Sequence, residues 1–195
     1  MLLRAMLGLV LGLGAAQAQE VAVPATPAAP AASALMEAMP AKRLKALKAS
    51  PEGFLEDAAE LIYATGHDGR IDAAGIDDFI ALRRAEVRAG RMRPFLAADL
   101  NNDGAIGRAE VGLFATALTA RRRGDVLWGF DVADADGDGS VTMPELRSLA
   151  ETAAMMVLDD VDAAGLRSLI LFDQDKDGAV AMDEVVSVVG ALLEK

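Results

Sequence analysis

The sequence predicts an all-α protein made of four repeated helix–loop–helix units, and three observations lead to this prediction. A twelve-residue acidic pattern recurs along the chain, the repeats are nearly evenly spaced, and apolar residues flank each repeat at helical intervals. The chain has 195 residues, of which 53% are hydrophobic, so it can bury a core of one compact domain or two small lobes.

The acidic pattern is clearest in Asp134–Glu145, which reads DADGDGSVTMPE. Carboxylates stand at the first, third and fifth places, a glycine at the sixth, valine at the eighth and a glutamate at the twelfth. Alternate residues of a curling loop can direct oxygens to a common centre, and a glycine at the sixth place permits the sharp turn. The pattern therefore predicts a site for a hard divalent cation, which prefers oxygen ligands.

Two other segments repeat this pattern, Asp99–Glu110 (DLNNDGAIGRAE) and Asp173–Glu184 (DQDKDGAVAMDE). The pattern resembles the EF-hand, and the resemblance over residues 51–195 is to a calmodulin-like four-hand protein. It implies three Ca²⁺ sites, with backbone carbonyls at the seventh places. The candidate ligands are Asp99, Asn101, Asp103, Ala105 and Glu110; Asp134, Asp136, Asp138, Ser140, Thr142 and Glu145; and Asp173, Asp175, Asp177, Ala179 and Glu184.

A fourth unit has the same outline without the ligands. Ala64–Gly75 reads ATGHDGRIDAAG, and aligning Gly69 with the turn glycine puts Ile71 at the eighth place. The first, third and twelfth places then hold alanine or glycine, which offer no side-chain oxygen. We expect this first loop to keep the fold and not the metal, while a non-standard Ca²⁺ loop remains an alternative.

The four loops begin at residues 64, 99, 134 and 173, with separations of 35, 35 and 39 residues. Units of this size cannot bury an apolar face alone, so they predict two EF-hand pairs, residues 51–122 and residues 123–195. In each pair the eighth residues should form a short antiparallel β bridge, Ile71 opposite Ile106 and Val141 opposite Val180.

The ligand sets predict that calcium binds most tightly to the third loop, then to the fourth, then to the second. Thr142 adds an oxygen at the ninth place of the third loop, whereas the fourth loop has Ala181 there. The second loop replaces one aspartate with Asn101, and affinity follows ligand charge. Mg²⁺ is the competing ion, but a glutamate that can give two oxygens favours the larger Ca²⁺.

The N-terminal residues predict export. Residues 1–18 have a positive start, a short apolar run and the small-residue pattern Ala16-Gln17-Ala18, typical of a cleaved signal peptide, so a periplasmic or secreted location is expected. An uncleaved anchor is the alternative. Residues 19–50 predict an extended Ala/Pro-rich tether followed by a basic lead-in helix. The helix, residues 34–49, is expected to be solvated, and contact with a membrane surface or an acidic partner is the alternative.

Composition excludes several classes of function. The formal net charge of −11 argues against nucleic-acid binding, and the chain has no cysteine and only one histidine, His67, which excludes thiolate and multi-histidine metal sites. No nucleophile elbow or phosphate loop is present in the sequence, so we do not expect an enzyme.

Two roles then remain. A calcium buffer or calcium-stabilised structural protein is favoured, and the alternative is a calcium sensor or adaptor that exposes an apolar groove for a partner protein. The sensor hypothesis depends on Met143, Met155, Met156 and Met182, which all lie in the second predicted pair. Methionines at helical spacing are also common core fillers, so they do not decide between the two roles.

Overall fold

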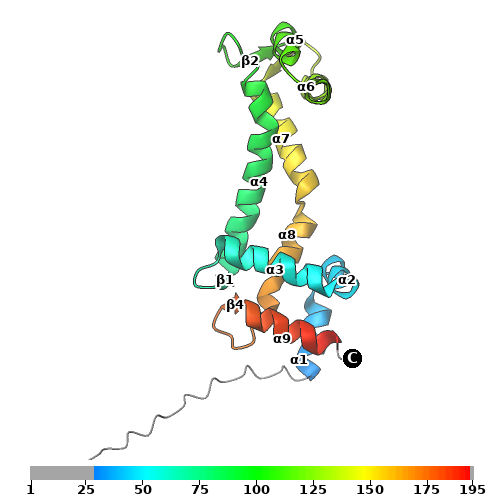
Figure 1. Cartoon of the computed structure of the whole chain (residues 1–195), viewed down its shortest axis with the longest axis vertical. Coiled ribbons are helices and arrows are strands. Elements are labelled where there is room, and N and C mark those ends of the chain that lie inside the picture. Colours follow the sequence, from blue (N-terminus) through cyan, green and yellow to red (C-terminus); the bar gives the residue numbers. More distant parts are fainter. Residues whose placement is uncertain (1–28, 194–195) are drawn as a thin grey trace, which may run out of the picture.

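The computed structural model describes residues 29–193, and it is predominantly helical with two small antiparallel sheets. The predicted export signal, residues 1–18, and residues 19–28 of the predicted tether lie outside the described part. Two lobes stand at opposite ends of a rod that is formed by two long helices lying side by side (Figure 1). The expected all-α class with short β bridges between loops is therefore confirmed.

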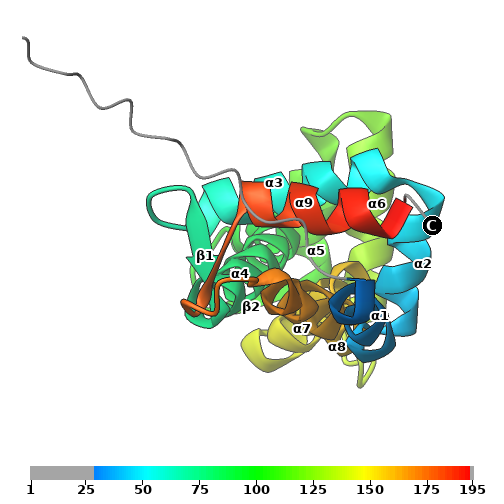
Figure 2. The ribbon, with the colours of Figure 1, turned by 90° about the horizontal axis from the view of Figure 1, so that it is seen from below.

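We call one end of the molecule the base lobe. It contains the chain's first and fourth loops and both ends of the described chain, and Figure 2 shows α9 lying beside α3 across it. Its elements are α1 (Ala29–Ala38), α2 (Ala41–Ala49), α3 (Pro51–Thr65), β1 (Arg70–Asp72), α8 (Asp160–Arg167), the 3-10 helix η1 (Ser168–Phe172), β4 (Ala179–Ala181) and α9 (Met182–Leu193).

The other end is the tip lobe, which contains the second and third loops. Its elements are β2 (Ala105–Gly107), α5 (Arg108–Thr116), α6 (Ala120–Ala133) and β3 (Ser140–Thr142). The rod helices α4 (Ala73–Leu96) and α7 (Met143–Val157) run between the lobes in opposite directions (Figure 1).

The loops pair differently from the prediction. β1 pairs with β4 and β2 pairs with β3, so Ile71 lies opposite Val180 and Ile106 lies opposite Val141. The prediction that eighth residues face one another in antiparallel ladders was right, but the predicted partners, first with second and third with fourth, were wrong. The four helix–loop–helix units, which we call hands, are paired first with fourth and second with third.

The physical reason for this pairing is the length of α4. The sequence suggested one helix leaving the first loop and another entering the second, but Ala73–Leu96 is a single helix of 24 residues. At 1.5 Å per residue it spans about 36 Å, which carries the second loop far from the first. The second and third hands, by contrast, are joined by a tight turn between α5 and α6, so they fold against each other.

Each lobe has its own apolar core. In the tip lobe the core surrounds Phe95 and Phe130, and in the base lobe it surrounds Phe54 and Phe172, whose ring centroids are 5.5 Å apart. The paired eighth residues are at most 1% exposed, so each ladder is also part of a core. Burial of these β-branched side chains links the geometry of one loop to that of its partner.

The rod is held by small side chains, an ion pair and a hydrogen bond. Ala150 and Ala154 of α7 are fully buried, which is consistent with close approach of the two helices. Arg88 of α4 pairs with Glu151 at 3.3 Å, and Arg84 donates to the carbonyl of Leu158 at 3.1 Å. No described helix is long and apolar enough to cross a membrane.

The basic lead-in segment differs from the solvated helix that was expected. It forms two helices, α1 and α2, because Pro40 disfavours helical backbone at the residue before it. α1 begins at Ala29, inside the segment predicted to be extended. Leu47 of α2 is 1% exposed and Arg43 stacks on the ring of Phe54 at 4.2 Å, so α2 is a part of the base lobe.

Candidate metal sites

The third loop gathers its three aspartates around one point. Oxygens of Asp134, Asp136 and Asp138 lie within 4.8 Å of one another. Backbone amides of the same loop hold them: Gly139 donates to Asp134 Oδ2 at 3.1 Å and Ser140 donates to Asp138 Oδ1 at 2.8 Å. The loop thus holds three negatively charged groups close together, and a bound cation would relieve the repulsion among them.

One atom of this loop tests whether a metal fits. Asp134 Oδ1 is buried and has no hydrogen-bond partner, and the Asp134 side chain is only 5% exposed. Buried polar atoms without partners are rare, because the loss of hydration is not repaid. A cation bound among the three carboxylates would supply the missing partner, so the residues fit the metal that the acidic pattern predicts.

Glu145 closes the third loop and begins α7. Its Oε1 accepts from the amide of Ala135 at 3.0 Å, and its Oε2 accepts from the amide of Thr142 at 2.8 Å. The hydroxyl of Thr142 donates to the same Oε2 at 2.7 Å. These bonds, first of all the one from the Thr142 amide, lower the pKa of Glu145 and favour the ionised form that would bind a metal.

The fourth loop repeats this construction. Oxygens of Asp173, Asp175 and Asp177 lie within 4.8 Å of one another. Glu184 is 7% exposed, and its oxygens accept from the amides of Gln174 at 2.8 Å and Ala181 at 2.9 Å. The carboxylates of the fourth loop are therefore arranged as in the third loop.

The second loop has the same frame with one fewer charge. Glu110 accepts from the amides of Leu100 at 3.0 Å and Gly107 at 2.9 Å, and its pKa is lowered chiefly by the bond from Gly107. The Asn101 side-chain amide donates to Asp103 at 2.8 Å. A backbone bond from Ala105 and this amide lower the pKa of Asp103.

The backbone confirms that these three loops share one conformation. Their fourth and sixth residues all have positive φ, from 58° at Asn102 to 92° at Gly178. Glycine adopts this conformation without steric penalty, which explains its place at the sixth position of every complete loop. The fourth place holds Asn102, Gly137 and Lys176.

The first loop has a different shape. His67 and Arg70 exchange two backbone hydrogen bonds of 2.8 and 3.0 Å around Asp68 and Gly69, both at positive φ. This is a tight two-residue hairpin turn, for which Asp-Gly is a preferred sequence. Four residues separate α3 from β1, whereas eight separate α4 from β2 in the second hand. The first loop is therefore too short to curl around an ion as the others do.

The first hand also begins its outgoing helix in another way. In the second and third hands the twelfth-place glutamate accepts a hydrogen bond from the backbone amide of the ninth residue. In the first hand Gly75 holds that place, and Asp72 instead accepts from the amide of Gly75 at 2.8 Å. Asp72 is thus the N-cap of α4, and the hand keeps its helix without a closing ligand.

Arg70 is the site residue that sequence analysis missed. It lies on β1 of the first hand, and its guanidinium pairs with Asp177 at 2.5 Å and with Asp175 at 3.4 Å in the fourth loop. A basic residue in a degenerate loop was visible in the sequence, but its target was not, because the predicted pairing placed the first loop against the second. Only the observed β1–β4 ladder brings Arg70 to these carboxylates.

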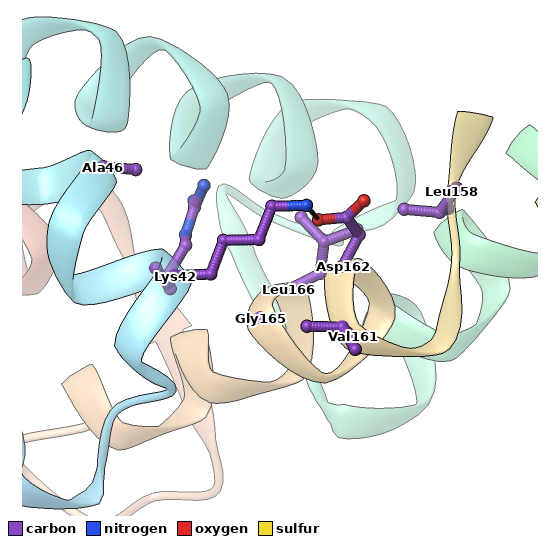
Figure 3. Close-up of a pocket in the computed structure, with 8 residues that line it drawn as sticks. Lys42, Ala46, Leu158, Val161, Asp162, Gly165 and Leu166 are labelled. Atoms are coloured by element: carbon purple, nitrogen blue, oxygen red, sulfur yellow. Dashed lines mark hydrogen bonds and ion pairs between the residues drawn. The ribbon is translucent and has the colours of Figure 1, made fainter. Parts of the chain in front are cut away.

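A separate cavity of about 140 Å³ lies between α2 and α8 (Figure 3). Its lining includes Ala46, Leu158 and Leu166, and an ion pair between Lys42 and Asp162 spans it. Arg43, which also lines it, pairs with Asp57 at 3.0 Å. Two of the four basic residues of this segment therefore hold the base lobe together.

Comparison with known families gives the same assignment for part of the chain. Residues 92–115 and residues 129–150 match the family model described as EF hand. These segments contain the second and third loops, which are the two paired loops of the tip lobe. They support an EF-hand family assignment, and EF-hands bind calcium ions. No curated protein and no solved structure matches the chain.

Proposed function

We propose that this protein binds three calcium ions, one in each of the second, third and fourth loops, and serves as a calcium buffer or calcium-stabilised structural protein. The observation that carries the proposal is the buried, unpartnered Oδ1 of Asp134 among three clustered carboxylates. When bound, the ion would neutralise charges that now repel one another, so binding should stabilise the fold.

The donor set favours calcium over Mg²⁺. Each complete loop ends in a glutamate held by backbone amides on both oxygens, at a place where both oxygens can turn to one ion. Ca²⁺ accepts six to eight oxygens in a flexible shell, whereas Mg²⁺ requires an octahedron and releases water reluctantly. Mg²⁺ is the competitor at high concentration.

The distribution of methionines supports a buffer or structural role over a sensor. Met143 packs against the tip-lobe core and Met182 against the base-lobe core, while Met156 is 83% exposed. The third and fourth hands lie in different lobes, so the methionines do not line one closed groove that calcium could open. The sequence suggested an apolar groove for a partner protein on a pair formed by the third and fourth hands, and these two hands do not pair with each other.

We also propose that the protein is exported. The N-terminal pattern of residues 1–18 supports export to the periplasm or beyond. No enzymatic activity is proposed, because the clustered carboxylates are assigned to metal.

The test is a calcium titration of residues 19–195 by calorimetry, with an apolar-surface dye present in a parallel sample. Three bound ions, a higher melting temperature and an unchanged dye signal are expected. The matched control is the triple variant Glu110→Gln, Glu145→Gln, Glu184→Gln, which keeps the side-chain shapes and should lose the response. Absence of calcium binding in the wild-type protein would refute the proposal, and a dye signal that rises with calcium would favour the sensor.

A further inference from the structure

The first hand contributes a positive charge to the fourth loop. Arg70 stands at the seventh place of the first loop, and the β1–β4 register sets it opposite Ala181. From there its two terminal nitrogens reach Asp177 Oδ2 at 2.5 Å and Asp175 Oδ2 at 3.4 Å. Two of the three clustered aspartates of the fourth loop are therefore paired with a residue from another hand.

These ion pairs occupy the oxygens that the loop's own backbone leaves free. Asp175 Oδ1 accepts from the amide of Asp177 at 3.1 Å, and Asp177 Oδ1 accepts from the amide of Ala179 at 3.0 Å. The Oδ2 atoms are the ones that face Arg70. Both oxygens of each carboxylate are thus engaged, so an incoming cation must displace the guanidinium or bind beside it.

The third loop offers an internal comparison. Within residues 34–193, Asp136 and Asp138 form no ion pair, and the nearest arginine, Arg108, is 4.0 Å from Asp134 while it pairs with Asp131 at 2.9 Å. The two loops carry the same acids at the first, third, fifth and twelfth places. They differ in the arginine that their partner hand provides: Arg70 pairs with two aspartates of the fourth loop, whereas Arg108 pairs mainly with Asp131, outside the third loop.

We propose that Arg70 sets the calcium affinity of the fourth loop, acting as a built-in counter-ion that holds Asp175 and Asp177 together without metal and must be displaced when calcium binds. This inference rests on the proposed calcium function. The Arg70 side chain is 40% exposed, so it has room to swing into water on release. The first hand, although it lacks ligands of its own, thereby regulates the site of its partner.

Two effects of Arg70 act in the same direction. Its ion pairs stabilise the metal-free loop, and its charge repels a divalent cation at close range. Because the pairs are partly exposed and screened by salt, the combined effect is moderate. Removal of the charge should tighten calcium binding at the fourth loop by roughly three- to thirtyfold, the range expected for one or two such pairs.

The test is a calcium titration of the Arg70→Met protein followed by nuclear magnetic resonance. The amides of Gly104, Gly139 and Gly178 each bond to the first aspartate of their own loop, at 3.1, 3.1 and 3.0 Å, so each resonance reports one site. Methionine keeps the unbranched stem of the side chain and has neither a charge nor an oxygen. The midpoint reported by Gly178 should move to lower calcium, with the other two unchanged.

Three further variants complete the experiment. Arg83→Met removes the same charge from an exposed pair with Glu86 on α4, and it should leave the Gly178 midpoint in place. Arg70→Lys keeps the charge and should retain most of the wild-type affinity. Arg70→Gln serves if the methionine variant does not fold, which is checked by the Ile71–Val180 contact in the same spectra.

The outcomes separate this inference from the proposed function. An unchanged or weakened Gly178 midpoint in folded Arg70→Met, with normal titration of Gly104 and Gly139, would overturn the role of Arg70 and leave calcium binding intact. A wild-type protein in which none of the three glycines responds to calcium would instead refute the proposed function.

Discussion

The tip lobe and the base lobe are built on one plan, two hands joined by a three-residue antiparallel ladder, yet the first hand of the base lobe differs from the other three. In the tip lobe the second and third loops both carry a full set of candidate ligands. In the base lobe the fourth loop has the full set, and the first is a short hairpin that offers Arg70 instead. The comparison teaches that a hand without acidic ligands of its own can still place a charge on the carboxylates of its partner loop.

The ladders suggest how this difference changes calcium binding. In the tip lobe Ile106 and Val141 are both in the buried core, so an ion that orders one loop also orders the backbone of the other. We expect positive cooperativity between the second and third sites. The base lobe has one complete set of candidate ligands, so calcium there should bind without cooperativity and against the charge of Arg70.

The largest expected effect comes from truncation of the ladder residues. Ile106→Ala and Ile71→Ala each remove most of a side chain that is 1% exposed, which should lower the free energy of unfolding by about 2–5 kcal/mol. Urea denaturation of the metal-free proteins measures this loss. Site-resolved calcium titration should then show Ile106→Ala weakening the second and third sites together, and Ile71→Ala weakening the fourth alone. Weakening of all three sites by either variant would mean that the lobes are coupled through the rod.

The closing glutamates give the next largest effect. Glu145→Gln should weaken the third site on the order of a hundredfold, because affinity follows ligand charge over several orders of magnitude. It should also weaken the second site through the β2–β3 ladder. Glu184→Gln should remove the fourth site and leave the tip lobe unchanged, as measured by calorimetric titration of both variants. If instead Glu110→Gln alone abolished the tightest binding event, the predicted order of affinities, third, fourth, second, would be wrong.

A smaller effect is expected at Gly66, which lies between the end of α3 and the short hairpin. A Cβ on Gly66 would overlap the backbone carbonyl oxygens of Ile62 and Arg70, which cannot move without breaking the turn. Gly66→Ala should therefore destabilise the base lobe by about 1–3 kcal/mol in urea denaturation. The control is Gly112→Ala on α5, where a Cβ meets nothing within 4 Å and where alanine should stabilise the helix by about 0.5–1 kcal/mol. Equal effects of the two substitutions would contradict the close packing of the first hand.

The smallest effect concerns pH and the tip lobe. The pKa of Glu145 is lowered in the folded protein, first by the backbone bond from Thr142, so its contribution to stability is present above the unfolded value of about 4.3. This contribution is lost as the pH falls through the lower folded pKa. The difference in unfolding midpoint between metal-free wild type and Glu145→Gln should therefore shrink as the pH falls from about 6 to below the unfolded value. A difference that grew on acidification would show that repulsion among the loop's carboxylates dominates.

Much of the local structure could be predicted from the sequence. The three complete loops, their sixth-place glycines and their closing glutamates follow from the requirements of an oxygen shell and of a sharp turn, and they recur in the structure with the same hydrogen bonds. The alignment of the first loop on Gly69 was also correct at the eighth place, since Ile71 pairs with the eighth residue of another loop. These features are local, so spacing and residue type specify them.

The pairing of the hands could not be predicted in the same way. All four eighth residues are isoleucine or valine, and any two of them could form a ladder of the same kind. Their partners were decided by the continuity of α4, whose packing on α7 favours one long helix over two short ones with a bend between them. The sequence by itself determined which loops carry the acidic pattern expected of a calcium site. Only the tertiary structure decided which loops face each other, and it therefore also placed Arg70 against the carboxylates of the fourth loop. The reason is that strand pairing and ion pairs between residues distant in the chain depend on where the helices carry those residues.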